Sequence, residues 1–167
     1  MKVVYLTHFY PPSPCGRAGV YTAALAEAFQ KTGIDCHVLY VGDWDTDKQY
    51  FNGYSDDVHN GVPVRRLHVN WTKAPRLFDY LYDNPIPAQH IRAYLERTQP
   101  DLVHVTSCYT LSAQAIVTPQ QMGIPVVVHL VDIWFICPTH QLLRKDGRLC
   151  YGSKGRLGLS ELHLRGL

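Results

Sequence analysis

Short apolar runs alternate with helical patterns along most of the chain. Strands are expected at four brief runs rich in Val, Leu and Tyr, namely residues 2–7, 36–41, 102–105 and 126–130. The run at 126–130 has the most strand-like composition, because three consecutive valines open it. Strands that alternate with helices predict an α/β fold: a Rossmann-like parallel sheet with helices on both faces.

Apolar periodicity predicts three helices. A second helix is predicted to end before Pro100, and a third to cover residues 111–122 with a kink or a break at Pro119. The first helix follows Gly16-Arg17-Ala18-Gly19. Its predicted apolar stripe consists of Val20, Ala24, Leu25, Ala28 and Phe29.

The stretch before the second helix is more polar. Residues 43–57 are rich in Asp, Asn and Gly and predict a long loop. Asn60-Gly61 is a turn signal, and the apolar residues around it indicate a short hairpin or an extended segment.

Composition and charge narrow the class of protein. The 167 residues are 46% hydrophobic and 18% charged, which is typical of one globular domain. The formal net charge of +2 argues against a dedicated nucleic-acid binder, which would carry a basic stripe. No apolar run reaches bilayer length, and Pro11 and Pro12 follow the first strand too soon for a signal peptide. With five scattered cysteines and no CxxC, we expect reduced thiols and a cytoplasmic protein.

Leucines and glycines alternate in the last part of the chain, from Gly152 to Leu167. A stable domain seldom ends on a run of leucines with nothing after them. Either this tail packs back on the domain, or the sequence was cut from a longer chain. The same leucines could also serve self-association, for example through domain swapping.

The loop between the first strand and the first helix carries the first candidate site. Gly16, Arg17 and Gly19 lie where backbone N–H groups and the helix dipole favour an anion such as phosphate. Arg17 adds a permanent positive charge. The spacing is neither GxGxxG nor a P-loop, so a plain strand-to-helix turn is an equal alternative.

The second candidate site follows the last predicted strand. His129 and Asp132 lie at or just past its end, where the crevice of an α/β sheet opens. Either could act as a general acid or base, or bind sugar hydroxyls. Alternation puts them on opposite faces unless the strand ends between them. Taken alone, His129 fits a hydrogen-bonded core histidine better, and Asp132 fits a helix N-cap equally well.

Three aromatic residues, Tyr10, Tyr109 and Trp134, fall in or near predicted loops. A sugar ring could stack on such side chains, although aromatic rings also simply fill cores. They are therefore candidate substrate-binding residues.

A zinc site is the remaining chemical alternative. Cys137, His140 and Cys150 are zinc-ligand types, with His129 nearby. Structural zinc sites use two closely spaced pairs, and Cys150 lacks a close second, so no metal is expected.

Blocks of this sequence resemble glycosyltransferase family 4. Residues 3–39 contain matches to the family's opening strand, "FYPP" loop and "ELAxxL" helix. Residues 100–105 resemble "PDVVHVH", and residues 123–138 are similar to "GIPVVxTxHDxWxxCP". Residues 142–150 resemble the "LLxPDGxxC" stretch of one subgroup. The blocks cover most of the chain in the family's order.

The resemblance implies a retaining glycosyltransferase with a two-domain GT-B fold. Residues 1–167 would be an incomplete N-terminal, acceptor-side domain, inactive by itself. An absent C-terminal domain with an acidic "Ex7E" motif would mostly hold the nucleotide sugar, the co-substrate, and no cofactor is implied. The acceptor would be a glycan, a lipid or a small molecule. Membrane-surface association is common among the family's glycolipid enzymes, so the expected cytoplasmic protein could also be peripheral at the inner membrane face.

The chain departs from the family pattern at three site positions. Val131 stands at the histidine of "HD", Arg17 at the second glycine of the loop, and Thr106 at the second histidine of "HVH". These changes keep open a non-catalytic binding or assembly module derived from the same fold. A free-standing nucleotide-binding domain is a third alternative, for which Asp43 and Asp45 are the acidic residues available to a ribose.

Overall fold

The computed structural model describes residues 1–42, 53–69, 82–137, 142–144 and 146–150. Its residues form two compact units, 1–131 and 132–167, and each is described by itself. The predicted self-association of the leucine-rich tail falls on residues outside the described part. Among the described residues, no helix is long and apolar enough to cross a membrane.

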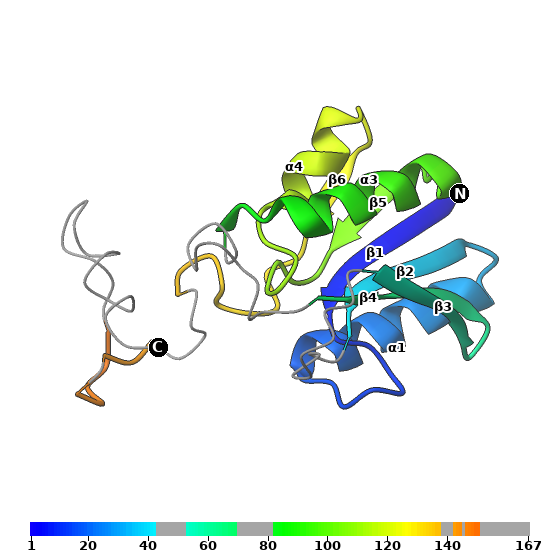
Figure 1. Cartoon of the computed structure of the whole chain (residues 1–167). Helices are drawn as coiled ribbons and strands as arrows, with labels where there is room; N and C mark the ends of the chain where they lie inside the picture. The colour runs from blue at the N-terminus through cyan, green and yellow to red at the C-terminus, as the bar shows by residue number, and fades with distance from the viewer. Residues whose placement is uncertain (43–52, 70–81, 138–141, 145, 151–167) are drawn as a thin grey trace. The chain divides into compact units, whose positions relative to one another are not determined.

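The first unit is built on a six-stranded sheet in the order β3-β4-β2-β1-β5-β6 (Figure 1). All neighbouring strands pair in parallel except β3, which is antiparallel to β4. The α/β class and the mostly parallel sheet confirm the prediction. The strands are β1 (Lys2–His8), β2 (Asp35–Val41), β3 (Gly53–His59), β4 (Val62–His68), β5 (Leu102–Val105) and β6 (Val126–Val128).

The order of the strands reverses at β1. From β1 the chain moves outward through β2 to the hairpin, and it returns to the other side of β1 as β5. Such a reversal opens a crevice at the carboxyl ends of the two central strands, which is where open α/β sheets bind ligands. By this rule, the expected crevice of this protein lies between the end of β1 and the end of β5.

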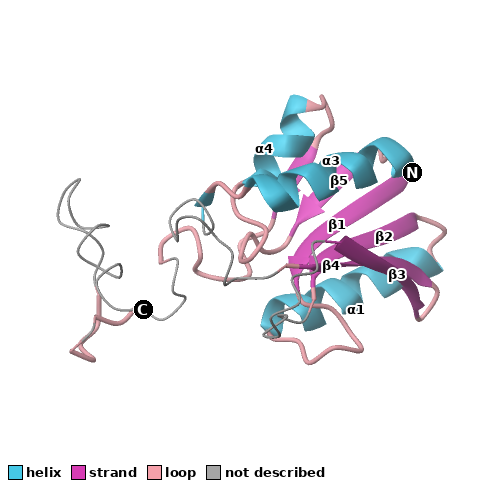
Figure 2. Cartoon of the chain, in the orientation of Figure 1, coloured by secondary structure: helices cyan, strands magenta, loops and turns pink. Residues whose placement is uncertain are grey.

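Helices cover both faces of the sheet (Figure 2). Helix α1 (Arg17–Lys31) packs against β1, β2 and β4, whereas α4 (Gln114–Gln121) packs against β5 and β6. Helix α3 (Pro85–Thr98) lies beside α4 on the opposite face from α1. Asn84 starts α3 by accepting a hydrogen bond from the backbone N–H of Ile86 at 3.0 Å.

The buried face of α1 differs from the predicted stripe. Val20 and Phe29 are 57% and 38% exposed, whereas Leu25 of the predicted stripe is partly buried and packs against the core. The helix meets the sheet through small side chains, which let its backbone approach closely. These buried residues are Ala18, Gly19, Thr22, Ala23 and Ala26.

Helix α4 and strand β3 differ from the predictions. Helix α4 starts at Gln114 rather than at 111, and Pro119 lies inside its last turn without ending it. Residues 53–57 belong to β3, although their polar composition predicted a loop. Strand β3 is an edge strand whose hydrogen bonds to β4 hold it extended, so it needs little apolar surface of its own.

Candidate functional site

His8, Tyr109 and Thr110 meet at the carboxyl ends of β1 and β5. The Nδ1 atom of His8, the last residue of β1, lies 3.1 Å from the Oγ1 atom of Thr110. The ring of Tyr109 contacts the His8 ring edge to face, with centroids 4.5 Å apart. Burial raises the pKa of Tyr109, so its hydroxyl stays protonated at neutral pH. The predicted site residue Tyr109 therefore lies at the crevice, next to a histidine.

Left-handed backbone conformations cluster at the same edge of the sheet. Phe9, Thr110 and Ser112 have φ angles of 58°, 66° and 61°. Residues with a Cβ rarely adopt such angles, and they concentrate at ligand-binding and catalytic positions. Phe9 directly follows His8, and Thr110 is the residue that His8 contacts.

Three buried threonine hydroxyls, those of Thr7, Thr22 and Thr106, form a hydrogen-bonded cluster near this edge of the sheet. The Thr22 hydroxyl on α1 lies 2.7 Å from the Thr106 hydroxyl after β5 and 3.3 Å from the Thr7 hydroxyl on β1. It also donates to the carbonyl of Ala18 at 2.7 Å. All three threonines are at most 1% exposed. The cluster therefore ties α1 to the two central strands just beneath the crevice.

Replacing Thr22 with the isosteric valine is expected to lower the free energy of unfolding by about 1–2 kcal/mol. The change leaves the buried hydroxyls of Thr7 and Thr106 without their hydrogen bonds to Thr22. Thermal or urea unfolding measures this loss. Thr32→Val is the matched control, since its exposed hydroxyl donates only to the Phe29 carbonyl. Equal losses in the two variants would show that the buried cluster contributes nothing special.

The predicted phosphate-binding residues form the start of α1. Gly16 is the N-cap residue, and no described side chain caps the helix. Arg17 follows as an exposed first helical residue. Gly19 is buried, and a Cβ there would lie 2.9 Å from the carbonyl oxygen of Phe9. The uncapped N–H groups and the Arg17 charge leave this helix end suited to an anion.

His129 follows β6 directly and lies near two other aromatic rings. Its Nδ1 atom is 3.0 Å from the Tyr21 hydroxyl of α1. Its ring stacks on that of His104 in β5, with centroids 6.0 Å apart and an angle of 12° between the planes. Burial, with a smaller contribution from His129, lowers the pKa of His104. His104 is therefore a neutral partner in the stack at pH 7.

The strand ends before His129, two residues earlier than predicted. His129 is consequently an exposed residue at the carboxyl edge and not a core histidine. The Nε2 atom of His129 has no hydrogen-bond partner among the described residues.

Asp132 and Trp134 belong to the second compact unit. A carboxylate oxygen of Asp132 accepts a hydrogen bond from the backbone N–H of Trp134 at 2.9 Å, which closes a turn. Trp134 is 5% exposed, and its ring contacts Phe135 edge to face at 5.1 Å. The joint action of Asp132 with His129 stays a prediction.

Tyr10 is fully buried in the first unit. Its ring lies against Tyr40 and His59 within the core on the α1 face. A sugar would need an exposed ring face for stacking, which Tyr10 does not offer in this structure. For the zinc alternative, His140 lies outside the described residues. Within the described residues, no three His, Cys, Asp or Glu side chains gather to hold a metal ion.

Sequence reasoning missed His8, Thr110, Tyr21 and His104. The rule that pointed to His129, a polar residue at the end of a strand, applies equally to His8. Tyr21 and His104 could not be found in that way, because a helix residue and a mid-strand residue reach His129 only through the packing of α1 on the sheet.

Three solved structures are similar to this chain. The C-terminal domain of a hydrogenase from Pyrococcus furiosus is 18% identical with a TM-score of 0.51, covering 77% of this chain and 91% of that one. Sucrose-phosphate synthase from Thermosynechococcus elongatus is 15% identical with a TM-score of 0.49, and the match covers 82% of this chain but 36% of the synthase. A second structure of that synthase is 14% identical, with a TM-score of 0.43 and coverage of 86% and 72%.

These identities are low, so the hydrogenase domain shows the fold alone. A comparison with curated protein sequences finds no match. The description that fits the sequence itself is "Glycosyl transferase 4-like domain", which matches residues 17–160. That match covers far more than half of the chain and includes α1, the hydroxyl cluster residues Thr22 and Thr106, and His129. The chain therefore belongs to the glycosyl transferase 4-like domain family.

Proposed function

We propose that this chain is the acceptor-side domain of a retaining glycosyltransferase, which transfers a sugar from a nucleotide-sugar donor to a glycan, lipid or small-molecule acceptor. The observation that carries the proposal is the exposed His129 imidazole at the carboxyl edge, hydrogen-bonded to Tyr21 within a glycosyl transferase 4-like domain.

His129 would contact the acceptor through Nε2, because Tyr21 occupies Nδ1. If the Tyr21 hydroxyl accepts the proton of Nδ1, Nε2 is unprotonated and can accept the proton of an acceptor hydroxyl. If Tyr21 donates instead, Nε2 carries the proton and donates to a sugar oxygen. In either tautomer Tyr21 fixes the ring and leaves Nε2 for the substrate.

The N-terminus of α1 would stabilise negative charge on the donor. As the bond to the leaving group breaks, charge accumulates on the diphosphate, and fixed donors lower the energy of that state. Gly16, Arg17 and Gly19 supply backbone N–H groups and a guanidinium at one helix end. A second domain would hold the nucleotide and the rest of the donor, as the resemblance to glycosyltransferase family 4 implies.

A non-catalytic module is the second candidate. It is favoured by Thr106, which is 1% exposed and bonded to Thr22, so it is unable to touch a substrate in place of the family's histidine. Under this alternative the fold is kept and no sugar is transferred.

Two measurements test the proposed function. The natural gene product containing these residues is assayed for sugar transfer from UDP- and GDP-sugars to a panel of acceptors. The 167-residue chain is titrated with the same donors by calorimetry. We expect transfer by the gene product and no donor binding by this chain alone. Tight donor binding by this chain alone would favour a free-standing nucleotide-binding domain, and no transfer with any donor would favour the non-catalytic module.

In that assay, His129→Ala is expected to raise the acceptor KM about tenfold, the cost of one well-placed hydrogen bond. The donor KM and the melting temperature should stay unchanged, because His129 is exposed. Val127→Ala, which trims an exposed side chain on the neighbouring strand segment, is the matched control. A change in the donor KM alone would contradict an acceptor role for His129.

A further inference from the structure

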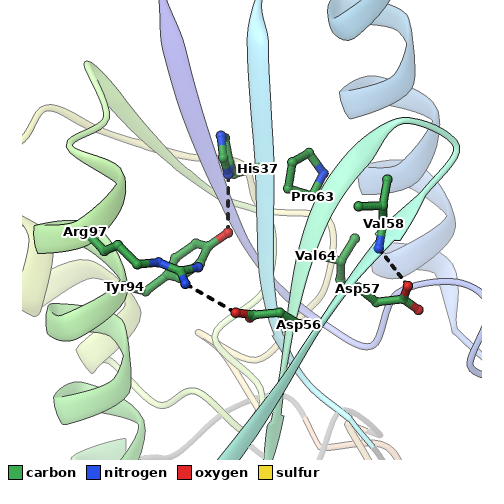
Figure 3. Close-up of a pocket in the computed structure, with 8 residues that line it drawn as sticks. All are labelled: His37, Asp56, Asp57, Val58, Pro63, Val64, Tyr94 and Arg97. Atoms are coloured by element: carbon green, nitrogen blue, oxygen red, sulfur yellow. Dashed lines mark hydrogen bonds and ion pairs between the residues drawn. The ribbon is translucent and has the colours of Figure 1, made fainter.

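A pocket lies away from the crevice, between the β3–β4 hairpin, β2 and α3 (Figure 3). Its volume of about 410 Å³ falls within the range of small-molecule sites. Eight residues line it: His37, Asp56, Asp57, Val58, Pro63, Val64, Tyr94 and Arg97.

The pocket is at the amino-terminal end of the parallel strands. His37 is near the start of β2, and Arg97 is in the last turn of α3. That end of α3 lies at the beginning of β1, since the Lys2 ammonium donates to the Thr98 carbonyl at 2.9 Å. The crevice with His8 is at the opposite, carboxyl end. The two sites are therefore separate.

Arg65 fixes one wall of the pocket. It is 3% exposed and donates two hydrogen bonds of 2.7 Å to the two carboxylate oxygens of Asp56. Its guanidinium lies over the Tyr54 ring at 3.5 Å and over the Tyr94 ring at 4.8 Å. The Asp56 carboxylate is thus held in one position, yet 43% of its side chain remains exposed and able to accept further hydrogen bonds.

Arg97 supplies donors on the same side. One of its N–H groups reaches Asp56 at 3.3 Å, and its side chain is 57% exposed. Its guanidinium also lies near the Tyr94 ring, 5.3 Å from the ring centroid. The Tyr94 hydroxyl lies 3.4 Å from Nδ1 of His37 and closes the inner end of the pocket.

The charges around the pocket cancel. The guanidinium groups of Arg65 and Arg97 balance the carboxylates of Asp56 and Asp57. Burial lowers the pKa of His37, against an opposing effect of Asp35, so this histidine is neutral at pH 7. A ligand with net charge of either sign therefore gains little here.

The lining combines hydroxyl-binding groups with an apolar wall. Val58, 62% exposed, and Pro63 face each other across the hairpin and offer an apolar surface. Asp56 and Arg97 present an acceptor and donors side by side. Adjacent hydroxyls on a ring can donate to the first and accept from the second.

We propose that this pocket binds a neutral saccharide, with neighbouring hydroxyls bridging Asp56 and Arg97 and an apolar face of the ring on Val58 and Pro63. The site is distinct from the transfer site and would hold a sugar unit of a glycan away from the reacting end. It does not depend on the proposed transfer activity, because binding needs no donor.

The test is a titration of the ¹⁵N-labelled chain with methyl α-D-glucopyranoside, methyl α-D-galactopyranoside and maltotriose, followed by amide chemical shifts. We expect saturable shifts at Val58, Val64 and Tyr94, with a Kd on the order of 1 mM. If maltotriose binds more tightly than the monosaccharides, the ligand is an oligosaccharide. If all three bind equally, the pocket takes a single sugar unit.

Arg97→Ala should weaken binding about tenfold or abolish it, whereas Arg92→Ala, on the same helix and bonded only to Gln121, should leave it unchanged. Both arginines are exposed, so the fold is kept, and thermal unfolding verifies this. The proposal is overturned if no shifts occur with any probe, if Arg97→Ala binds as the unmodified chain does, or if the shifts gather at Tyr21 and His129.

Discussion

Replacing Asp56 with alanine is expected to lower the free energy of unfolding by about 2–3 kcal/mol. The change leaves the buried guanidinium of Arg65 without either of its 2.7 Å hydrogen bonds. Removing one partner of a fully buried ion pair costs about 3–5 kcal/mol, and the half-exposed position of Asp56 lets water recover part of this. The tyrosine rings on both sides of Arg65 cannot replace the lost acceptor.

Urea unfolding of Asp56→Ala and of Asp57→Ala measures the effect. Asp57 is the neighbouring residue and accepts only the backbone N–H of Val58, at 2.7 Å, so its removal should cost less than about 1 kcal/mol. If both variants lost similar free energy of unfolding, the two hydrogen bonds from Arg65 to Asp56 would not be important for stability. Arg65→Met in the Asp56→Ala background should recover stability, because it removes the unpaired charge and retains apolar volume.

The same pair predicts a pH dependence. Hydrogen bonds from Arg65 lower the pKa of Asp56, against the opposing effect of its partial burial. A carboxyl whose pKa is lower in the folded state stabilises the fold above its unfolded pKa of about 4. That stability is lost as the pH falls through the folded pKa. We therefore expect the unmodified protein to lose stability below about pH 4 more steeply than Asp56→Ala does.

Gly19→Val is expected to destabilise the protein by about 3 kcal/mol. A Cβ at position 19 would lie 2.7 Å from the Cβ of Cys15 and 2.9 Å from the carbonyl oxygen of Phe9. The carbonyl is backbone, so it can move only if the loop from His8 to Gly16 moves with it. The strain therefore falls on the segment that joins the crevice to α1.

Gly16→Ala is the matched control for Gly19→Val. No atom lies within 4 Å of a Cβ at Gly16, and its φ of −80° suits any residue. This substitution should lower the free energy of unfolding by no more than about 1 kcal/mol, because alanine is a poorer N-cap residue than glycine. Thermal unfolding of both variants decides the matter. A Gly19→Val variant as stable as Gly16→Ala would mean that the loop relaxes without cost.

Much of the fold was accessible from local pattern. The short apolar runs at β1, β2, β5 and β6 predicted these four strands directly from the sequence, although two of the three valines of β6 are exposed. Strand β3 was not predicted over residues 53–57, because its polar residues are held extended by hydrogen bonds to β4 and not by their own composition. The stripe on α1 was misassigned for a related reason: periodicity favours large apolar residues, whereas close packing on this sheet requires small ones such as Ala23 and Ala26.

The sequence by itself determined the class of fold and the family, because strand alternation and ordered motifs are local properties. Only the tertiary structure decided which residues stand together. It paired His8 with Thr110, set His129 against Tyr21 and His104, and placed Tyr10 inside the core. It also brought Arg97 of α3 to Asp56 of the hairpin. These partners are far apart along the chain, and their contacts arise from the crossover that places α1 and α3 on opposite faces of the sheet.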